Sequence, residues 1–310
     1  MSAPKLRRRS LLRGIPTLAL AACSPRVESS SPRAAKREAV DFRSAHEGFR
    51  TALSSDGPSP SKWVEHDPPA GVEEVRYRSG ALELKAWYAR PLPVTRTATI
   101  PAPALVYFHN DFVFTPASFA ATEPFRAAGW AVLCPMLRGE NGNPGRFELL
   151  RGELDDARAA VRWIHEQAQV DAARVYAFGH SIGGGVAAML SLFNDEPVRR
   201  TGSCGGLYVP STFGRWAQSK RNSRLIRFDP QDTTECEMRV LGPHLDQMVR
   251  EHVAYIGDDD SWFITNAEAT MARPGARASM LTIERVPGDH MSSLKPALTD
   301  FLRRAEDDRR

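Results

Sequence analysis

The chain has 310 residues, of which 25% are charged, and a formal net charge of +4 at pH 7. The charge excess is small and partly lies in the first dozen residues, and no basic stretch is interleaved with aromatic residues, so the composition argues against a nucleic-acid-binding protein. The length suits one α/β domain with a large core.

The N-terminus has the pattern of an export signal followed by a lipid-attachment site. Arg8-Arg9, followed by Leu11-Leu12, resembles a twin-arginine signal, and the apolar stretch 15–22 is too short to span a bilayer. Leu20-Ala21-Ala22-Cys23 resembles a bacterial lipobox. We therefore expect an export signal over 1–22 and a lipid on Cys23 that holds the protein at the membrane of the bacterial cell envelope. The alternative is an ordinary cleaved signal with an incidental cysteine.

Residues 23–37 are rich in Ser, Pro, Ala and charge and predict a flexible tether before a catalytic domain over 38–310. In the first half of that domain the patterns predict a helix over 37–53, a hairpin of strands 72–77 and 82–88, a strand over 104–108, a helix over 119–128, a strand over 130–134 and a helix over 154–168.

In the second half the patterns predict strands over 174–178, 205–209, 252–256 and 280–286 and helices after residue 182, around 267 and over 298–305. A hairpin followed by alternating strands and helices predicts an α/β fold: a mostly parallel, doubly wound sheet with an antiparallel N-terminal pair.

The strand over 174–178 leads into Gly179-His180-Ser181-Ile182-Gly183, which fits the Gly-x-Ser-x-Gly turn that exposes a serine hydroxyl between a strand and a helix. A side chain at either glycine position would clash where the helix folds back on the strand. Ser181 is therefore the candidate nucleophile. The alternative is a glycine-rich turn with an inert N-cap serine.

A serine nucleophile needs a base and a group that orients the base. His290, in the loop after the last predicted strand, is the candidate base, whereas His244 and His252 fit solvated positions better. The acid is expected after the preceding strand, where Asp258, Asp259 and Asp260 are adjacent. Asp260 has the favoured spacing, and Asp259 or Asp258 is the alternative acid. One of the three is expected to turn inward and two to face water.

An oxyanion hole needs two backbone N–H donors. The N–H of Ile182 is the first candidate, and the loop after Phe108 should supply the second. That loop begins His109-Asn110-Asp111, so Asn110 is the second candidate.

Cys134 lies in an apolar strand and is expected to be buried, and a bridge between Cys204 and Cys236 stays open. No group of cysteines and histidines has zinc-like spacing, and the expected chemistry needs no metal or other cofactor.

Together these residues resemble the α/β-hydrolase superfamily, and more narrowly its dienelactone-hydrolase-like and prolyl-oligopeptidase-like catalytic domains. The His-Gly-Gly pattern of the superfamily is replaced by His109-Asn110-Asp111. Further similar stretches lie at 87–91, 138–145 and 153–157, and the resemblance covers about Val72 to Leu302.

The resemblance implies a serine hydrolase that forms an acyl-enzyme on a small ester or a short peptide. An ester is favoured, because dienelactone hydrolases carry cysteine where this chain has Ser181 and no long N-terminal stretch is available for a propeller. The alternatives are a prolyl-oligopeptidase-like serine peptidase and a non-catalytic binding lipoprotein.

Two further segments are candidates for contact with substrate. The loop 138–145 either positions substrate through Arg138, Glu140 or Asn141, or is a turn held by its own side chains. The segment 213–236 is either a small lid, with apolar residues over an acyl pocket, or an exposed loop with solvated charges.

Overall fold

The computed structural model describes residues 41–91 and 101–308. The chain divides into two units, Met1–Ala39 and Val40–Arg310, and the described residues belong to the second unit. The predicted export signal, the predicted lipid attachment at Cys23 and the predicted tether lie outside the described residues.

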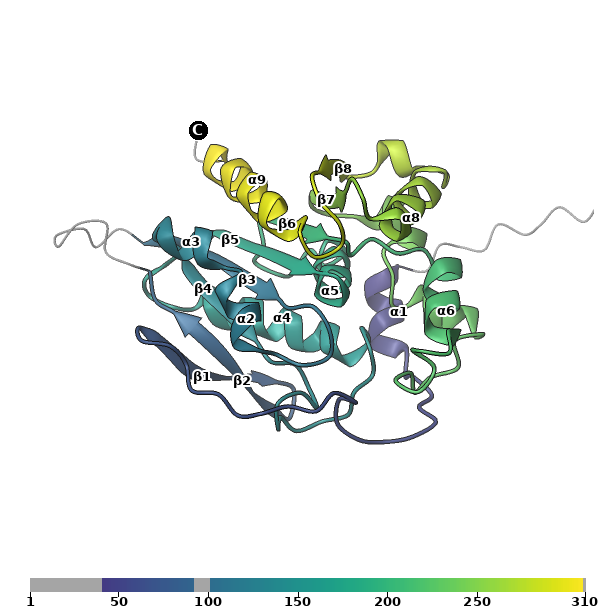
Figure 1. Cartoon of the computed structure of the whole chain (residues 1–310), viewed down its shortest axis with the longest axis horizontal. Coiled ribbons are helices and arrows are strands. Elements are labelled where there is room, and N and C mark those ends of the chain that lie inside the picture. Colours follow the sequence, from purple (N-terminus) through teal and green to yellow (C-terminus); the bar gives the residue numbers. More distant parts are fainter. Residues whose placement is uncertain (1–40, 92–100, 309–310) are drawn as a thin grey trace, which may run out of the picture. The chain divides into compact units, whose positions relative to one another are not determined.

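The described part of the domain is built on one eight-stranded sheet with the order β1-β2-β4-β3-β5-β6-β7-β8 (Figure 1). β1 pairs antiparallel with β2, β2 pairs antiparallel with β4, and all the following pairs are parallel. The strands are β1 Val72–Ser79, β2 Leu82–Ala89, β3 Ala102–Phe108, β4 Ala131–Pro135, β5 Val170–His180, β6 Arg200–Cys204, β7 His252–Gly257 and β8 Leu281–Val286. This is the α/β fold with an antiparallel N-terminal pair that the sequence predicts.

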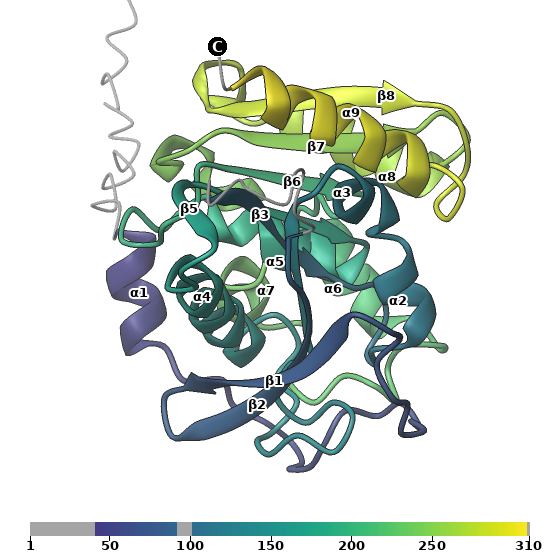
Figure 2. The same cartoon turned by 90° about the vertical axis from the view of Figure 1, so that its left-hand side faces the viewer.

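Helices cover both faces of the sheet, as a parallel sheet requires. α4 (Gly152–His165) and α5 (Ile182–Leu190) pack on one face, and α2 (Pro116–Ala120), α3 (Glu123–Ala127) and α9 (Leu294–Asp307) on the other (Figure 2). The remaining helices are α1 Phe42–Gly48, α6 Pro210–Gln218, α7 Thr233–Glu237 and α8 Ser261–Met271, with short 3-10 helices η1 Gly242–Gln247 and η2 Ala276–Ala278.

Each face of the sheet has its own apolar core. Along β3, Val106 and Phe108 belong to the core under α4 and α5, while Leu105 and Tyr107 belong to the core under α2, α3 and α9. Successive strand residues point to opposite faces, so a continuous apolar run buries both. The alternation explains why β3, β4 and the part of β5 over 175–178 are unbroken apolar segments in the sequence.

Two of the predicted helices are shorter or broken. The helix predicted over 37–53 is α1, which ends at Gly48 because Phe49 adopts an extended backbone. The helix predicted over 119–128 is two short helices, α2 and α3. Pro124, which has no N–H to donate, lies in the first turn of α3, and the Thr122 hydroxyl donates to the carbonyl of Phe119.

The prediction of a strand over 205–209 is wrong. The strand is β6, Arg200–Cys204, and it ends where Gly205 takes a φ of +59°. The residues that follow form a loop, with Gly206 so close to the backbone of Gly184 in α5 that a side chain would overlap it. Because β6 contains the polar residues Thr201 and Ser203, it does not form the apolar run by which the other buried strands were predicted.

The hydroxyls of Thr201 and Ser203 are buried because they pair with a buried histidine. His252, expected to be solvated, is fully buried on β7, with Nδ1 2.8 Å from Thr201 Oγ1 and Nε2 2.9 Å from Ser203 Oγ. Burial lowers the pKa of His252 to about 3. The ring is therefore neutral at pH 7 and joins β6 to β7 by side-chain hydrogen bonds.

Cys134 is buried as predicted, and Cys204 and Cys236 are free thiols, so the bridge between them does not form. Across 41–91 and 101–308, none of the helices has both the length and the apolar character needed to cross a bilayer.

The buried His252 makes stability depend on pH in a definite direction. Folding lowers the pKa of His252 from 6.5 to about 3. Its contribution to the free energy of unfolding is therefore complete above about pH 6.5, and it is lost as the pH falls toward the pKa of the folded state. Between pH 8 and pH 5 the free energy of unfolding should drop by about 2 kcal/mol through this residue.

Urea unfolding of wild type and His252→Gln at both pH values measures this drop, and His66→Gln, at an exposed position, is the matched control. The drop should shrink by about 2 kcal/mol in His252→Gln and stay unchanged in His66→Gln. An equal drop in all three proteins would contradict the assignment.

Candidate active site

Ser181 lies at the sharp turn between β5 and α5, with φ +54° and ψ −118°. Few residues other than glycine adopt a positive φ, so the serine is held in a strained conformation. A Cβ at Gly179 would overlap the carbonyl group of Gly183, and a Cβ at Gly183 would overlap the carbonyl oxygens of Phe108 and His109. The two glycines of the motif are thus required by close backbone packing.

The structure brings Ser181, His290 and Asp260 together from three separate loops. Ser181 Oγ lies 3.0 Å from His290 Nε2, and His290 Nδ1 lies 2.8 Å from Asp260 Oδ2. Ser181 follows β5, Asp260 follows β7 and His290 follows β8. All three strands are parallel, so the three residues gather at the carboxyl edge of the sheet.

The three adjacent aspartates differ in how far they are buried. Asp260 is 7% exposed, whereas Asp258 and Asp259 are exposed to solvent. Asp260 uses its other oxygen, Oδ1, to accept the N–H of Phe263 at the start of α8, and Asp258 pairs with Arg285. The N-cap bond orients the Asp260 carboxylate, which frees Oδ2 for His290.

Three further residues hold the His290 ring, and the sequence analysis did not identify them. Phe263 stacks on it with ring centroids 5.2 Å apart, and His180 Nε2 donates to the carbonyl of His290 at 2.8 Å. A Cβ at Gly205 would lie 2.8 Å from the imidazole. Burial lowers the pKa of His180 to about 4, so His180 is neutral at pH 7 and does not add a charge beside His290.

Tyr208 is a fourth residue that the sequence analysis missed. Its side chain is almost fully buried, packs against Phe263 and acts on the same site as Ser181, and burial raises its pKa, so it stays protonated. The sequence analysis placed Tyr208 inside a strand over 205–209 and therefore did not consider it as a site residue.

The two predicted oxyanion donors lie on adjoining segments. Ile182 is the first residue of α5, and the contacts of Gly183 with Phe108 and His109 set α5 against the end of β3. In the loop after β3 the positive φ, +66°, belongs to Asp111 and not to Asn110. The donor roles of Ile182 and Asn110 remain a prediction.

His109 anchors this loop. Its Nε2 lies 3.0 Å from Glu140 Oε2, and its Nδ1 lies 2.9 Å from the carbonyl oxygen of Asn110. Burial, the largest single effect, lowers the pKa of His109, but the charge of Glu140 and the hydrogen bonds to Glu140 and Asn110 together outweigh burial and raise the pKa. The histidine and the carboxylate thus form a buried pair under the oxyanion loop.

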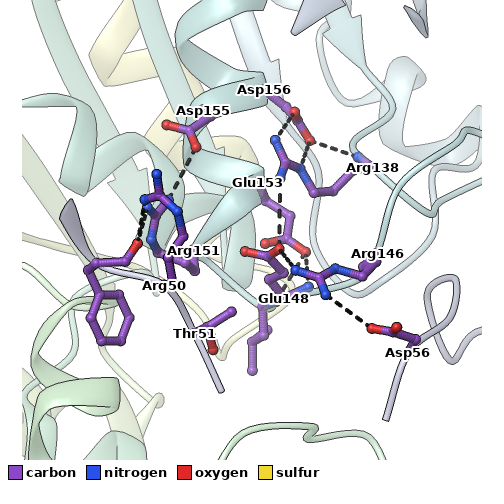
Figure 3. Close-up of polar contacts among 12 residues, drawn as sticks. Arg50, Thr51, Asp56, Arg138, Arg146, Glu148, Arg151, Glu153, Asp155 and Asp156 are labelled. Atoms are coloured by element: carbon purple, nitrogen blue, oxygen red, sulfur yellow. Dashed lines mark hydrogen bonds and ion pairs between the residues drawn. The ribbon is translucent and has the colours of Figure 1, made fainter. Parts of the chain in front are cut away.

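The loop 138–145 is held by its own side chains, which fits the second of its two interpretations. The Arg138 guanidinium donates to Asp156 on α4 (Figure 3), and Asn141 exchanges hydrogen bonds with the backbone of Phe114. Glu140 is engaged by His109. The side chains of Arg138, Glu140 and Asn141 are therefore committed to protein partners.

The segment 213–236 contains most of α6 and the start of α7. Its aromatic residues pack inward, with the rings of Phe213 and Phe228 parallel at 6.3 Å, while Arg215, Lys220, Arg221 and Arg224 are exposed. Arg227 donates to the carbonyls of Gly57 and Pro58. A lid function for this segment stays a prediction.

The geometry is suited to removing a proton from a serine. The imidazole is within hydrogen-bond reach of the hydroxyl, and a buried carboxylate holds the opposite ring nitrogen, which fixes the tautomer. Among the residues that the structure describes, no group of three or more histidine, cysteine or acidic side chains could hold a metal ion.

Comparison with protein families and curated sequences gives partial matches. Residues 79–201 match the family described as X-Pro dipeptidyl-peptidase (S15 family). Two uncharacterized proteins from strains of Mycobacterium tuberculosis are each 34% identical over 138 residues, which cover 44% of this chain and 46% of each relative. The chain thus spans less than half of the length of these relatives.

Solved structures give longer matches at low identity. An esterase of Pyrococcus furiosus has a TM-score of 0.61 at 13% identity and covers 84% of this chain and 97% of its own. An acylaminoacyl peptidase of Pyrococcus horikoshii has a TM-score of 0.60 at 15% identity and covers 77% of this chain and 41% of its own. A puromycin-hydrolyzing peptidase of Mycobacterium tuberculosis has a TM-score of 0.61 at 17% identity and covers 76% of this chain and 40% of its own.

The contact between Asp260 and His290 predicts how the reactivity of Ser181 depends on the aspartates. Asp260→Asn keeps the N-cap oxygen but loses the charge beside the imidazole, so labelling of Ser181 by a fluorophosphonate should slow by about 10³-fold or more. Asp259→Asn and Asp258→Asn should label at the wild-type rate. A slow Asp259 or Asp258 variant beside a fast Asp260 variant would contradict the geometry.

Proposed function

Because the chain carries an α/β-hydrolase domain of the prolyl-oligopeptidase-like type, we propose that it is a serine hydrolase that cleaves a carboxylic ester, with an amide as the less favoured substrate. The observation that carries the proposal is the chain of contacts from Ser181 Oγ to His290 Nε2 and from His290 Nδ1 to Asp260 Oδ2, at 3.0 and 2.8 Å.

In the proposed reaction Ser181 is the nucleophile and His290 the general base. Ser181 Oγ bonds to the carbonyl carbon as its proton moves to His290 Nε2, and Asp260 stabilises the imidazolium that forms. The imidazolium then protonates the leaving alcohol, and the acyl group stays on Ser181. Water, deprotonated by His290, attacks the acyl-enzyme. The bond from Ser181 Oγ to the acyl carbon then breaks, Ser181 Oγ takes the proton back from His290, and the acid is released.

The negative charge on the carbonyl oxygen needs donors that are in place before the reaction. We assign this role to the N–H groups of Ile182 and Asn110. Ile182 begins α5, whose N-terminal dipole also favours an anion. The buried His109–Glu140 pair supports the loop that carries Asn110.

The ester preference has support from the extent of the structural matches. The fold matches the Pyrococcus furiosus esterase over 97% of its chain but the Pyrococcus horikoshii acylaminoacyl peptidase over only 41%. The peptidase alternative draws on the match of residues 79–201 to the S15 family. The close contact between Ser181 and His290 argues against a non-catalytic binding protein, which would need neither residue.

We also propose that the enzyme is exported and held at the bacterial cell envelope by a lipid on Cys23. The twin-arginine-like pattern and the lipobox-like pattern support this location.

Removing the nucleophile should abolish activity and leave the fold intact. Ser181→Ala should lower kcat for p-nitrophenyl butyrate by at least about 10⁴-fold, because the hydroxyl forms the acyl bond. Ser211→Ala, at an exposed serine on α6, is the control and should keep wild-type turnover. Undiminished turnover in a folded Ser181→Ala protein would refute the proposed mechanism.

A substrate panel separates esterase from peptidase. Short p-nitrophenyl esters and p-nitroanilides of the same acyl groups, including dipeptidyl ones, differ only in the leaving group. We expect kcat/KM to favour each ester far beyond the difference in their spontaneous hydrolysis rates. Efficient cleavage of a dipeptidyl anilide, with weak turnover of the esters, would make the peptidase alternative correct.

A further inference from the structure

The loop that follows β6 lies against the turn that carries Ser181. The carbonyl of Cys204, the last residue of β6, accepts the N–H of Ser181 at 2.9 Å. A Cβ at Gly205 would lie 2.8 Å from the His290 imidazole, and a Cβ at Gly206 would overlap the backbone of α5. Successive residues of this loop thus contact both the nucleophile's turn and the base.

Tyr208, in the same loop, packs its ring against the first turn of α5. A Cβ at Gly185 would lie 3.2 Å from Cε2 of Tyr208, which is bonded to the ring carbon that bears the hydroxyl. Gly185 donates its N–H to the carbonyl of Ser181 at 3.1 Å. Residues four apart in a helix lie on one face, so the hydroxyl end of Tyr208 lies on the side of α5 that carries Ser181.

Aromatic packing holds this ring in place. Its centroid lies 5.2 Å from that of Phe263 and 5.7 Å from that of Phe213, with both pairs edge to face. Phe263 in turn stacks on His290. Because these contacts are made by the ring and not by the hydroxyl, a variant that removes only the hydroxyl should keep the ring where it is.

The ionisation of Tyr208 reflects the same surroundings. Burial, the largest effect, raises the pKa of its hydroxyl, the Ser181 side chain lowers it, and the charge of Asp260 raises it. Ser181 is uncharged, so its side chain affects this pKa through short-range hydrogen bonding and not through charge. Because the pKa is raised overall, Tyr208 keeps a proton that it can donate.

We propose that Tyr208 is a further catalytic residue, whose hydroxyl donates a hydrogen bond to Ser181 Oγ. The inference rests on the proposed function, because it adds a group to the same reaction. Oγ gives its own proton to His290 Nε2, and a hydroxyl oxygen has two lone pairs that can accept. Tyr208 approaches from the β6 side of β5, whereas the proposed oxyanion donor Asn110 lies on the β3 side, so the two groups act on different oxygens.

The hydrogen bond stabilises Oγ at the two steps in which this atom gains negative charge. In acylation, Oγ becomes negative as its proton moves to His290 and its bond to the carbonyl carbon forms. In deacylation, the bond from Oγ to the acyl carbon breaks, its electron pair returns to Oγ, and His290 gives the proton back. Tyr208 keeps its own proton throughout, so the proton and electron balance of the proposed reaction is unchanged.

Tyr208→Phe tests the proposal, because it removes the hydroxyl and keeps the ring. Two measurements report bond formation at Oγ: kcat/KM for p-nitrophenyl butyrate and the rate of labelling by a fluorophosphonate. Both should fall by about 10- to 100-fold, the loss expected for one hydrogen bond to an atom that becomes charged. Urea unfolding checks that the variant is folded under the assay conditions.

Tyr107→Phe is the matched control. Tyr107 is also fully buried, but it belongs to the core on the opposite face of the sheet. Its hydroxyl has no hydrogen-bond partner among the residues that the structure describes. Both rates should therefore stay at the wild-type values in Tyr107→Phe, and a loss there as large as in Tyr208→Phe would contradict a specific role for Tyr208.

Two further readouts separate a catalytic hydroxyl from one that only shapes the site. The p-nitrophenyl esters of acetate, butyrate and hexanoate should lose the same factor in kcat/KM in Tyr208→Phe, because Oγ is common to all three reactions. The midpoint of the pH profile of kcat/KM should not move, because the hydrogen bond acts on Oγ and not on the His290 imidazole. Losses that vary with acyl length, or a shifted midpoint, would overturn the inference.

A crystal structure of the wild type gives a measurement that needs no variant. Tyr208 Oη should lie within about 3.2 Å of Ser181 Oγ, and a separation above about 4 Å would overturn the inference. Wild-type rates in a folded Tyr208→Phe protein would also overturn it and leave the proposed function standing. If the wild type cleaves none of the three esters and a fluorophosphonate does not label Ser181, the proposed function fails, and the inference fails with it.

Discussion

The close approach of backbone segments at the turn between β5 and α5 determines the geometry of the site. Gly179 and Gly183 leave no room for a Cβ, and Gly206 lies equally close to Gly184. The start of α5 therefore lies against three strands or the loops that follow them. It follows β5 directly, it contacts Phe108 and His109 at the end of β3, and it contacts the loop after β6 through Gly206. The same close packing flanks Ser181, which has a strained φ of +54°.

The histidine side of the site is built around the same turn. His180, next to the serine, holds the carbonyl of His290, and Gly205, at the end of β6, makes room for the imidazole. Asp260 both caps α8 and binds His290, so the start of a helix orients the carboxylate. A neutral His180 and a protonated Tyr208 leave Asp260 as the charged group hydrogen-bonded to the imidazole among the residues that the structure describes.

The sequence predicts a mostly parallel sheet with an antiparallel N-terminal pair. It also predicts the gathering of Ser181 and His290, because both residues follow apolar strands at recognisable turns. It does not predict β6, because Thr201 and Ser203 are polar residues whose burial depends on His252, which is distant in the sequence. The choice among Asp258, Asp259 and Asp260 likewise depends on which one caps α8.

The most direct test of the account is to find where the acyl group is attached during turnover. The protein is mixed with a slowly deacylating p-nitrophenyl ester, quenched with acid and mapped by peptide mass spectrometry. The account predicts acylation of the peptide that contains Ser181, with the modified atom assigned to that serine. Release of nitrophenol with the acyl group on another residue, or with no acyl-enzyme at any time point, would contradict it.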